Sequence, residues 1–214
     1  MNRFVSSWSG GKDSCYAYLL AVASGMQPMC LLNMMNENGE VSRSHAIPKH
    51  ILEKQASALQ LPIVTTPASW SQYEELFINS LHKIIWEHQV DTAVFGDIDL
   101  QEHRDWEENV CQKTGIKAYL PLWKGNRKEL VLQMIKLPIK AYIVSCNETM
   151  GERFLGRVID LALIAELEEL GVDSCGENGE YHTLVVDCPL FAKELEVSFG
   201  EKHHYGNYWF IEMY

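Results

Sequence analysis

The sequence predicts an α/β fold, in which a parallel, doubly wound sheet is followed by a smaller α+β domain at the C-terminus. Over residues 3–147, short apolar runs alternate with longer segments of helical periodicity, which is typical of a parallel sheet with crossover helices. The apolar runs are nearly continuous, as expected for strands that are buried on both faces. The last third of the chain has a different pattern, which ends in two strand-like segments around a turn.

The elements of residues 3–147 are predicted from apolar runs, helical periodicity and stops at glycine or proline. Ser71 and Glu74 have the spacing of a capping box at the start of one helix. A polar loop is expected at 36–45. The predicted strands are 3–8, 28–35, 61–67, 91–98, 117–123 and 139–147, and the predicted helices run from the glycine turn to Gly25, from Pro48 onward, and over 71–89, 102–115 and 127–136.

The last third of the chain predicts an amphipathic helix over 155–171 and then a polar turn that leads into a strand ending at residue 187. Two antiparallel strands are predicted within 195–213. We expect two domains, 1–125 and 126–214. The strand at 139–147 is compatible with either domain.

Charge and composition exclude several classes of protein. The formal net charge is −11, and phosphate backbones are bound by clustered Lys and Arg, so a nucleic-acid partner is not expected. No apolar run approaches the roughly 20 residues of a membrane helix, and the N-terminus lacks the pattern of a signal peptide. We therefore expect a soluble, cytoplasmic protein without a membrane partner. None of the six cysteines has C-x-x-C spacing, which disfavours a zinc site.

A glycine turn at residues 9–14 separates the first predicted strand from the first predicted helix. Its glycines permit a tight bend and leave room for a ligand against the backbone, while the helix start offers free N–H groups that suit a phosphate. The sequence is not a Walker A loop, because Ser6 stands at the first glycine position and Asp13 follows the lysine. A plain tight turn is the alternative reading. The turn consists of Ser9, Gly10, Gly11, Lys12, Asp13 and Ser14.

This turn resembles the PP-loop, S-G-G-x-D-S, of the N-type ATP pyrophosphatases. Such enzymes split ATP between its α and β phosphates and transfer AMP to an acceptor oxygen, with Mg²⁺ beside the phosphates. The resemblance implies a HUP-like fold of the adenine nucleotide alpha hydrolase type. It implies ATP and Mg²⁺ as cofactors, Lys12 and Asp13 as catalytic residues, and Asp13 near the metal. The residues expected around ATP are Ser9, Gly10, Gly11, Lys12, Ser14, Leu32, Asn33, Met34, Gly96 and Asp97.

Four further segments narrow the resemblance, and they occur in order along the chain. They are GDIDLQEHRDWEENVC at 96–111, PLW at 121–123, FLGR at 154–157 and CGENGEYHTLVVDCPLF at 175–191. Together with the glycine turn they resemble the diphthine–ammonia ligase family, also called the diphthamide synthase or ATP-binding domain-4 family, over nearly the whole chain. The compact length is similar to that of its bacterial-type branch. The most specific element is G-E-x-G-E-[YF]-x-T, which is matched by Gly176, Glu177, Gly179, Glu180, Tyr181 and Thr183.

The family resemblance implies an ATP-dependent carbon–nitrogen ligase. An acceptor carboxylate would become an acyl-adenylate with loss of pyrophosphate, and ammonia or an amine would then displace AMP. Glu177 and Glu180 are expected to act on the acceptor side, and solvated turn carboxylates are the alternative. Gly176, Gly179, Tyr181 and Thr183 are expected to bind substrate.

Three further residues are expected to bind substrate, each with a structural alternative. His45 lies in the loop after the second strand and is otherwise a surface histidine. Arg104 and Glu108 are four residues apart on one helix and are otherwise a simple ion pair. For Asp97, the alternative to nucleotide binding is a helix N-cap.

The acceptor is expected to be diphthine on elongation factor 2 if the source is archaeal or eukaryotic, and another carboxylate otherwise. A homo-oligomer is left open. Two other functions compete with the ligase. One is a PP-loop tRNA-modifying enzyme, which the negative charge disfavours, and the other is a non-catalytic nucleotide-binding regulator.

Overall fold

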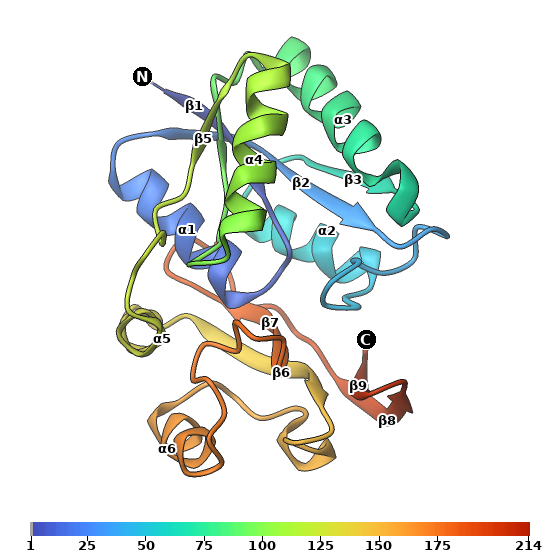
Figure 1. The fold of residues 1–214 in the computed structure, drawn as a ribbon, viewed down its shortest axis with the longest axis vertical. Helices are drawn as coiled ribbons and strands as arrows, with labels where there is room; N and C mark the ends of the chain where they lie inside the picture. Colours follow the sequence, from blue (N-terminus) through green and yellow to red (C-terminus); the bar gives the residue numbers. More distant parts are fainter. Residues whose placement is uncertain (1) are drawn as a thin grey trace.

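The computed structural model describes residues 2–214 and contains two sheets (Figure 1). The first sheet has five parallel strands in the order β3-β2-β1-β4-β5. The second has four antiparallel strands in the order β7-β6-β9-β8. The predicted α/β class, with a parallel doubly wound sheet and a smaller α+β part after it, is confirmed.

The first sheet is covered by helices on both faces. Alternate residues of β1 point to opposite faces, so that Phe4 packs in one apolar cluster with α1 and α2, and Val5 packs in another with α3 and α4. Its strands are β1 (Arg3–Ser7), β2 (Gln27–Met35), β3 (Ile63–Pro67), β4 (Thr92–Val94) and β5 (Lys117–Tyr119), and its helices are α1 (Lys12–Ala23), α2 (Lys49–Ala58), α3 (Tyr73–His88) and α4 (Gln101–Thr114), with the short helix η1 (Trp70–Gln72) before α3.

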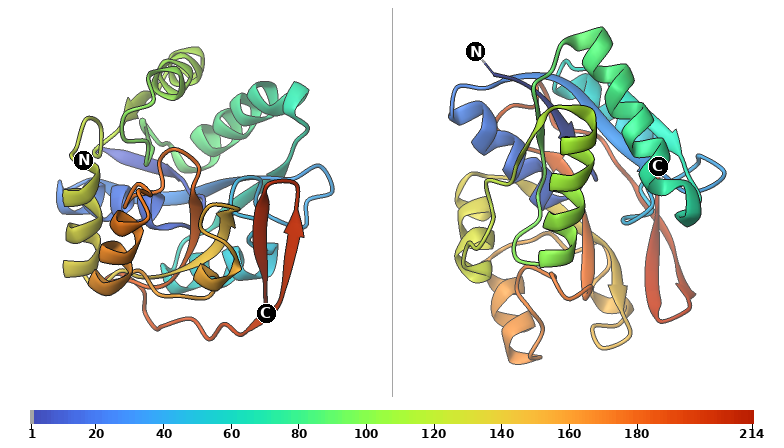
Figure 2. Two further views of the ribbon diagram at one scale, coloured as in Figure 1. Left: turned by 60° about the horizontal axis from the view of Figure 1, so that its bottom comes forward. Right: turned by 45° about the horizontal axis from the view of Figure 1, so that its top comes forward.

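The second sheet packs below α1 and α2, so that these two helices lie between the sheets (Figures 1 and 2). One apolar cluster continues from the first sheet through α1 and α2 into the second sheet and its helices. The elements of this part are α5 (Arg127–Lys136), β6 (Lys140–Asn147), η2 (Glu152–Phe154), α6 (Leu161–Glu169), β7 (Tyr181–Asp187), β8 (Phe199–Tyr205) and β9 (Tyr208–Met213).

The predicted strand at 139–147 belongs to the second sheet as β6. The residue range 120–126 connects the last strand of the first sheet to α5. The boundary predicted near 125 falls in this connection. Because an apolar cluster crosses from one part to the other, the division into domains 1–125 and 126–214 stays a prediction.

Two local predictions are wrong. The helix predicted over 155–171 begins only at Leu161, because Gly156 has a positive φ of 77° and Val158 bridges to Tyr142 of β6. The side chain of Asp160 then caps the helix by accepting a hydrogen bond from the Leu163 N–H.

The capping box at 71–74 is also absent. Ser71 lies inside η1, and Gln72 is the residue at the start of α3, without a side-chain cap. Glu74 instead accepts hydrogen bonds from Trp106 and Lys113 of α4. The strands predicted at 91–98 and 117–123 are shorter, since only Thr92–Val94 and Lys117–Tyr119 pair in the sheet.

No helix within residues 2–214 has the length and apolar character needed to cross a membrane.

The second sheet meets the first part of the chain along β7, whose Val185 N–H donates to the Gly10 carbonyl at 2.9 Å. Gln55 of α2 is fully buried at this seam. Its Nε2 donates to the carbonyls of Gly10 and Val185 at 3.0 and 2.7 Å, and its Oε1 accepts from Trp8 Nε1 at 2.8 Å.

We predict that Gln55→Leu lowers the free energy of unfolding by about 2–5 kcal/mol, because it leaves buried polar partners without hydrogen bonds, each worth about 1–3 kcal/mol. Denaturant unfolding followed by circular dichroism measures this loss. Glu53→Leu is the matched control, since Glu53 is exposed on the same helix, and its effect should stay within about 0.5 kcal/mol. Equal stability of the two variants would show that the seam does not depend on Gln55.

Candidate functional site

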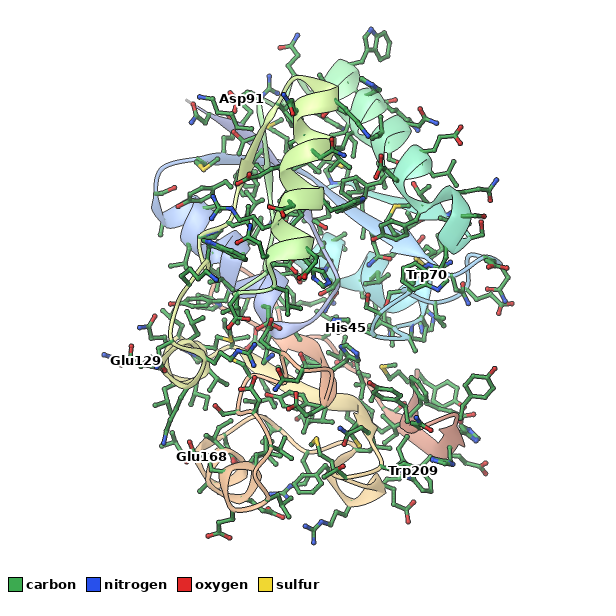
Figure 3. The ribbon with its side chains drawn as sticks, in the orientation of Figure 1. His45, Trp70, Asp91, Glu129, Glu168 and Trp209 are labelled. Atoms are coloured by element: carbon green, nitrogen blue, oxygen red, sulfur yellow. The ribbon has the colours of Figure 1, made fainter. Side chains whose placement is uncertain are left out.

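A cleft of about 1090 Å³ lies at the carboxyl ends of the parallel strands, where α/β sheets commonly bind ligands. Its walls are the glycine turn, the loop after β2, the starts of α3 and α4, and the segment 175–183 from the second part of the chain. His45 lies where the two parts meet, and Trp70 lies farther along the same side of the molecule (Figure 3). The cleft is therefore formed jointly by both parts.

Most of the predicted site residues line this cleft. They are Ser9, Lys12, Asp13, Ser14, Leu32, Asn33, Met34, His45, Gly96, Asp97, Gly176, Glu177, Gly179, Tyr181 and Thr183. Five predicted residues do not line it, namely Gly10, Gly11, Arg104, Glu108 and Glu180.

The glycine turn is closely packed, which explains its two glycines. Gly10 has a φ of 87°, which favours glycine, and an added Cβ there would lie 2.7 Å from the Ile47 side chain. Gly11 precedes α1, and a Cβ there would lie 2.3 Å from Cε1 of His45. Both glycines let the backbone of the turn pack closely against its neighbours, although neither glycine lines the cleft.

Lys12 is buried, and it links the glycine turn to the second part of the chain. Its Nζ lies 2.8 and 3.1 Å from the Asp13 carboxylate oxygens and donates to the Cys175 carbonyl at 2.5 Å. Burial opposes the charge, but the neighbouring Asp13 carboxylate raises the pKa of Lys12 above its ordinary value. Lys12 is therefore a permanent positive charge at the floor of the cleft.

Thr183 of β7 holds the start of α1 from the opposite side. Its Oγ1 accepts from the Lys12 N–H at 3.0 Å, and its carbonyl accepts from His45 Nδ1 at 2.8 Å. Burial lowers the pKa of His45 to about 4, and burial lowers that of His182, whose ring lies 4.8 Å from the His45 ring, to about 3. Both histidines are thus neutral near pH 7, and His45 acts as a hydrogen-bond donor inside the wall rather than as a surface residue.

Glu177 is the carboxylate of the signature that lines the cleft. Burial, with repulsion from Asp13 as the next cause, raises the pKa of Glu177 to about 7. A carboxyl group with this pKa can take up and release a proton near neutral pH, which suits general acid–base chemistry.

Glu180, which was predicted to be catalytic, does not line the cleft. Its oxygens accept hydrogen bonds from the Asn178 N–H and Nδ2, each at 3.0 Å, and from the Asp173 N–H at 3.4 Å. The side chain is folded back into its own loop and does not line the cleft. The geometry therefore favours a role in shaping the loop.

Arg104 and Glu108 also lie outside the cleft. Arg104 Nε donates to Glu108 Oε1 at 2.7 Å, and the guanidinium stacks on the Trp123 ring at 4.9 Å. This geometry favours the ion pair over the predicted role in substrate binding. Asp97 lines the cleft, and the residue before α4 is Leu100, so Asp97 is not a helix N-cap.

Gly96 explains how the end of β4 approaches the glycine turn. A Cβ at this position would lie 2.8 Å from the Asp13 carbonyl carbon and from the Ser14 nitrogen. Only glycine allows the two backbones to come this close. Asp97, the next residue, is thereby held beside the start of α1.

Arg127 of α5 was not singled out from the sequence. It makes a bidentate ion pair with Asp99 at 2.7 and 2.8 Å, and its Nη1 bonds Asp173 at 2.5 Å and Asn178 at 3.0 Å. Asp173 in turn accepts from the N–H groups of Cys175 and Glu177. Asp99 and Asn178 lie in segments that carry the family resemblance, but Arg127 lies outside them, and only the fold brings it to these partners.

His103 and Glu107 were also missed. They lie on α4, one turn apart, and both line the cleft with Asp97, whose Oδ1 is 2.7 Å from His103 Nδ1. The i, i+4 spacing of two ionisable residues, following Asp97 at a strand end, is the signal that could have found them.

Comparison with known proteins gives a consistent result over both parts of the chain. The family model described as the diphthamide synthase N-terminal domain matches residues 2–118, and the model of the diphthamide synthase C-terminal domain matches residues 126–214. The diphthine–ammonia ligases of Homo sapiens and Bos taurus are each 30% identical to the chain over 227 residues, covering 93% of it and 84% of their own length. That of Danio rerio is 27% identical, covering 93% of the chain and 88% of its own length.

We predict that Gly11→Ala weakens the binding of ATP by about tenfold or more. The added methyl group would meet the His45 ring and the Thr183 carbonyl, at 2.3 and 3.1 Å, so the glycine turn must shift. Titration with a non-hydrolysable ATP analogue measures the affinity. The double variant Gly11→Ala/His45→Ala removes the closest contact and should recover most of the loss, while His45→Ala alone keeps the turn. Unchanged affinity in Gly11→Ala would refute the packing explanation.

We predict that stability falls as the pH rises through the raised pKa of Glu177, about 7. A carboxyl group with a raised pKa binds its proton more tightly in the folded chain, so its contribution is present in acid and is lost above that pKa. Glu177→Gln should therefore raise the free energy of unfolding by about 1–3 kcal/mol at pH 8, and by less at pH 5. Denaturant titrations at both pH values test this, with Glu169→Gln, at an exposed position of α6, as control.

Proposed function

Because the chain belongs to the diphthamide synthase family, we propose that its cleft activates an acceptor carboxylate with ATP and joins it to a nitrogen donor. The chain is an ATP-dependent carbon–nitrogen ligase that forms AMP. The observation that carries the proposal is the meeting of the glycine turn with the signature segment at Lys12, whose Nζ bonds both Asp13 and the Cys175 carbonyl.

The glycine turn is the proposed seat of the triphosphate. The first N–H groups of α1 and the positive end of its dipole favour an anion there, and Lys12 adds a fixed positive charge. Ser9 and Ser14 supply hydroxyl donors, and their oxygens are 3.0 Å apart. Leu32, Asn33 and Met34, with Gly96 and Asp97, line the part of the cleft proposed for the adenosine.

The reaction has two steps. An oxygen of the acceptor carboxylate attacks the α-phosphorus of ATP, the bond from that phosphorus to the bridging oxygen breaks, and pyrophosphate leaves on the glycine turn. The nitrogen donor then attacks the acyl carbon, and AMP leaves with the electron pair of the broken carbon–oxygen bond. Stabilising pyrophosphate is the proposed role of Lys12, because a buried cation beside a leaving anion assists charge separation.

Glu177 is proposed to receive the proton that the nitrogen donor loses. It lines the cleft, and its pKa of about 7 suits a base at neutral pH. The 175–183 segment lines the same cleft as the glycine turn, and it is proposed to help exclude water from an acyl-adenylate. Tyr181 and Thr183 are proposed to position this segment, and Gly176 and Gly179 to admit the acceptor.

Mg²⁺ is proposed to arrive with the triphosphate. Within residues 2–214 no three His, Cys, Asp or Glu side chains form a group that could hold a metal ion, so the protein offers no cage of its own. The carboxylate of Asp13 is the oxygen ligand of the glycine turn, and Mg²⁺ usually takes one or two carboxylates together with substrate phosphates. When bound, the ion would neutralise charge on the phosphates.

The acceptor is proposed to be a carboxylate on a protein or small molecule. The curated relatives are diphthine–ammonia ligases, and diphthine on elongation factor 2 with ammonia is therefore the proposed pair wherever the source makes diphthine. The net charge of −11 gives no support to a nucleic-acid acceptor.

We predict that ATP and Mg²⁺, supplied with ammonium chloride and a carboxylate acceptor, yield AMP and pyrophosphate. Glu177→Gln should lower turnover by about a hundredfold or more while the affinity for ATP stays within about tenfold, since the loss of a proton acceptor acts on the chemical step. Product analysis by ion-exchange chromatography and nucleotide titration give both quantities on one preparation.

Glu169→Gln is the control, because the residue is exposed on α6 and lies outside the cleft. ADP and phosphate as the only products would refute the assignment. Tight ATP binding without pyrophosphate release for every acceptor tried would favour the nucleotide-binding regulator.

A further inference from the structure

An acidic wall lies along the α4 side of the cleft. It consists of Asp97 at the end of β4 and of Glu102 and Glu107 on α4. Asp97 pairs with His103 Nδ1 at 2.7 Å, whereas within residues 2–214 neither Glu102 nor Glu107 makes an ion pair. Negative charge repels phosphates and attracts cations, so this wall suits a positively charged ligand other than the nucleotide itself.

Glu107 is the residue that points most directly to a ligand. It is only 4% exposed although it lines the cleft. Its Oε2 is buried without a hydrogen-bond partner among residues 2–214. Buried polar atoms are nearly always hydrogen-bonded in native proteins, so a free carboxyl oxygen in a cleft wall indicates a hydrogen-bond donor that arrives with a ligand.

The pair of Asp97 and Glu107 carries one negative charge near neutral pH. Burial, assisted by the bond to Asp97, raises the pKa of Glu107 to about 11. Burial opposes ionisation of Asp97 as well, but hydrogen bonds from His103, at 2.7 Å, and from Glu107 lower its pKa. The pair therefore holds one proton, and a single negative charge matches a monovalent cation better than a divalent metal.

Aromatic rings line the same cleft as this pair. The Tyr73 and Trp106 rings are 5.6 Å apart, and both line the cleft. The Phe77 ring packs edge-on against Trp106 at 5.0 Å and fixes its position. Aromatic faces attract weakly hydrated cations and exclude water, so the surroundings favour an ammonium group over a hydrated metal ion.

The position of the pair suits the second step of the reaction. Gly96 packs on the backbone of Asp13 and Ser14, so Asp97 lies directly beside the glycine turn. Glu177 and Asp13 line the same cleft as Asp97, and the charges of Asp13 and Asp97 both act to raise the pKa of Glu177. A cation held by Asp97 would therefore lie in the same cleft as Glu177.

We propose that Asp97 and Glu107 form the subsite for the ammonium group of the nitrogen donor, with Tyr73 and Trp106 as its apolar wall. This proposal rests on the proposed function, because an amide-forming reaction is what consumes such a group. His103 is a positioning residue that orients Asp97 through its Nδ1.

The subsite would supply the nitrogen nucleophile from bound ammonium. Bound ammonium gives one proton to Glu177, and the freed electron pair of nitrogen forms the bond to the acyl carbon. The carbon–oxygen bond to AMP breaks, and its electron pair leaves on the AMP phosphate. The nitrogen then loses a second proton to solvent, which leaves a neutral amide.

The test is a calorimetric titration of the full chain with ammonium, methylammonium and n-butylammonium chloride at constant ionic strength, with and without α,β-methylene-ATP. We expect saturable binding by the wild-type chain. Asp97→Asn and Glu107→Gln should each weaken it by about tenfold or more, the loss expected when a charged ligand loses a carboxylate or its partner. Asp105→Asn is the matched control, because this carboxylate lies on the same helix, is exposed and does not line the cleft.

The three cations distinguish the sources of the ammonium group. Binding of ammonium alone indicates free ammonia as donor, and binding of the alkylammonium ions indicates an organic amine. Absence of saturable binding for all three, or unchanged binding in both variants, would overturn the subsite. The affinity for α,β-methylene-ATP should change by no more than about twofold in Glu107→Gln and Asp105→Asn. Failure of the wild-type chain to bind this analogue would refute the proposed function separately.

Discussion

The hydrogen bond from the Val185 N–H to the Gly10 carbonyl is the contact on which the cleft depends. It joins β7, the strand of the signature segment, to the glycine turn. Gln55 reinforces this contact by donating hydrogen bonds to the carbonyls of Gly10 and Val185. Thr183 makes two further bonds beside it, to Lys12 and His45. The glycine turn is thus shaped by a strand of the other sheet as well as by its own glycines.

The same contact explains which parts of the fold the sequence could predict. The strands of the parallel sheet and the helices around it follow from apolar runs and local stops, which depend on neighbouring residues. The start of α6 does not, because Gly156 and Val158 pair with β6 instead of continuing a helix. The predicted capping box is absent for a similar reason, since Glu74 accepts hydrogen bonds from Trp106 and Lys113 of α4.

The site shows the same limit. The signature placed Glu177 in the cleft, but it could not separate Glu177 from Glu180, because the direction of a side chain depends on the loop that holds it. Arg127 was not predicted, since its partners Asp99 and Asp173 come from distant parts of the sequence. Spacing in the sequence identifies a turn or a helix face, whereas a buried network requires the fold.

The meeting of β7 with α1 also has a consequence for how the chain is made. Lys12 and its partner Thr183 are 171 residues apart in sequence. Contacts between such distant residues form late and slow the folding of a domain, because a long loop must first be closed. During synthesis on the ribosome, the glycine turn therefore emerges long before the strand that completes it. A nascent chain therefore carries the glycine turn without the strand that holds it, and a ligand of the completed cleft stabilises only the folded chain that includes β7.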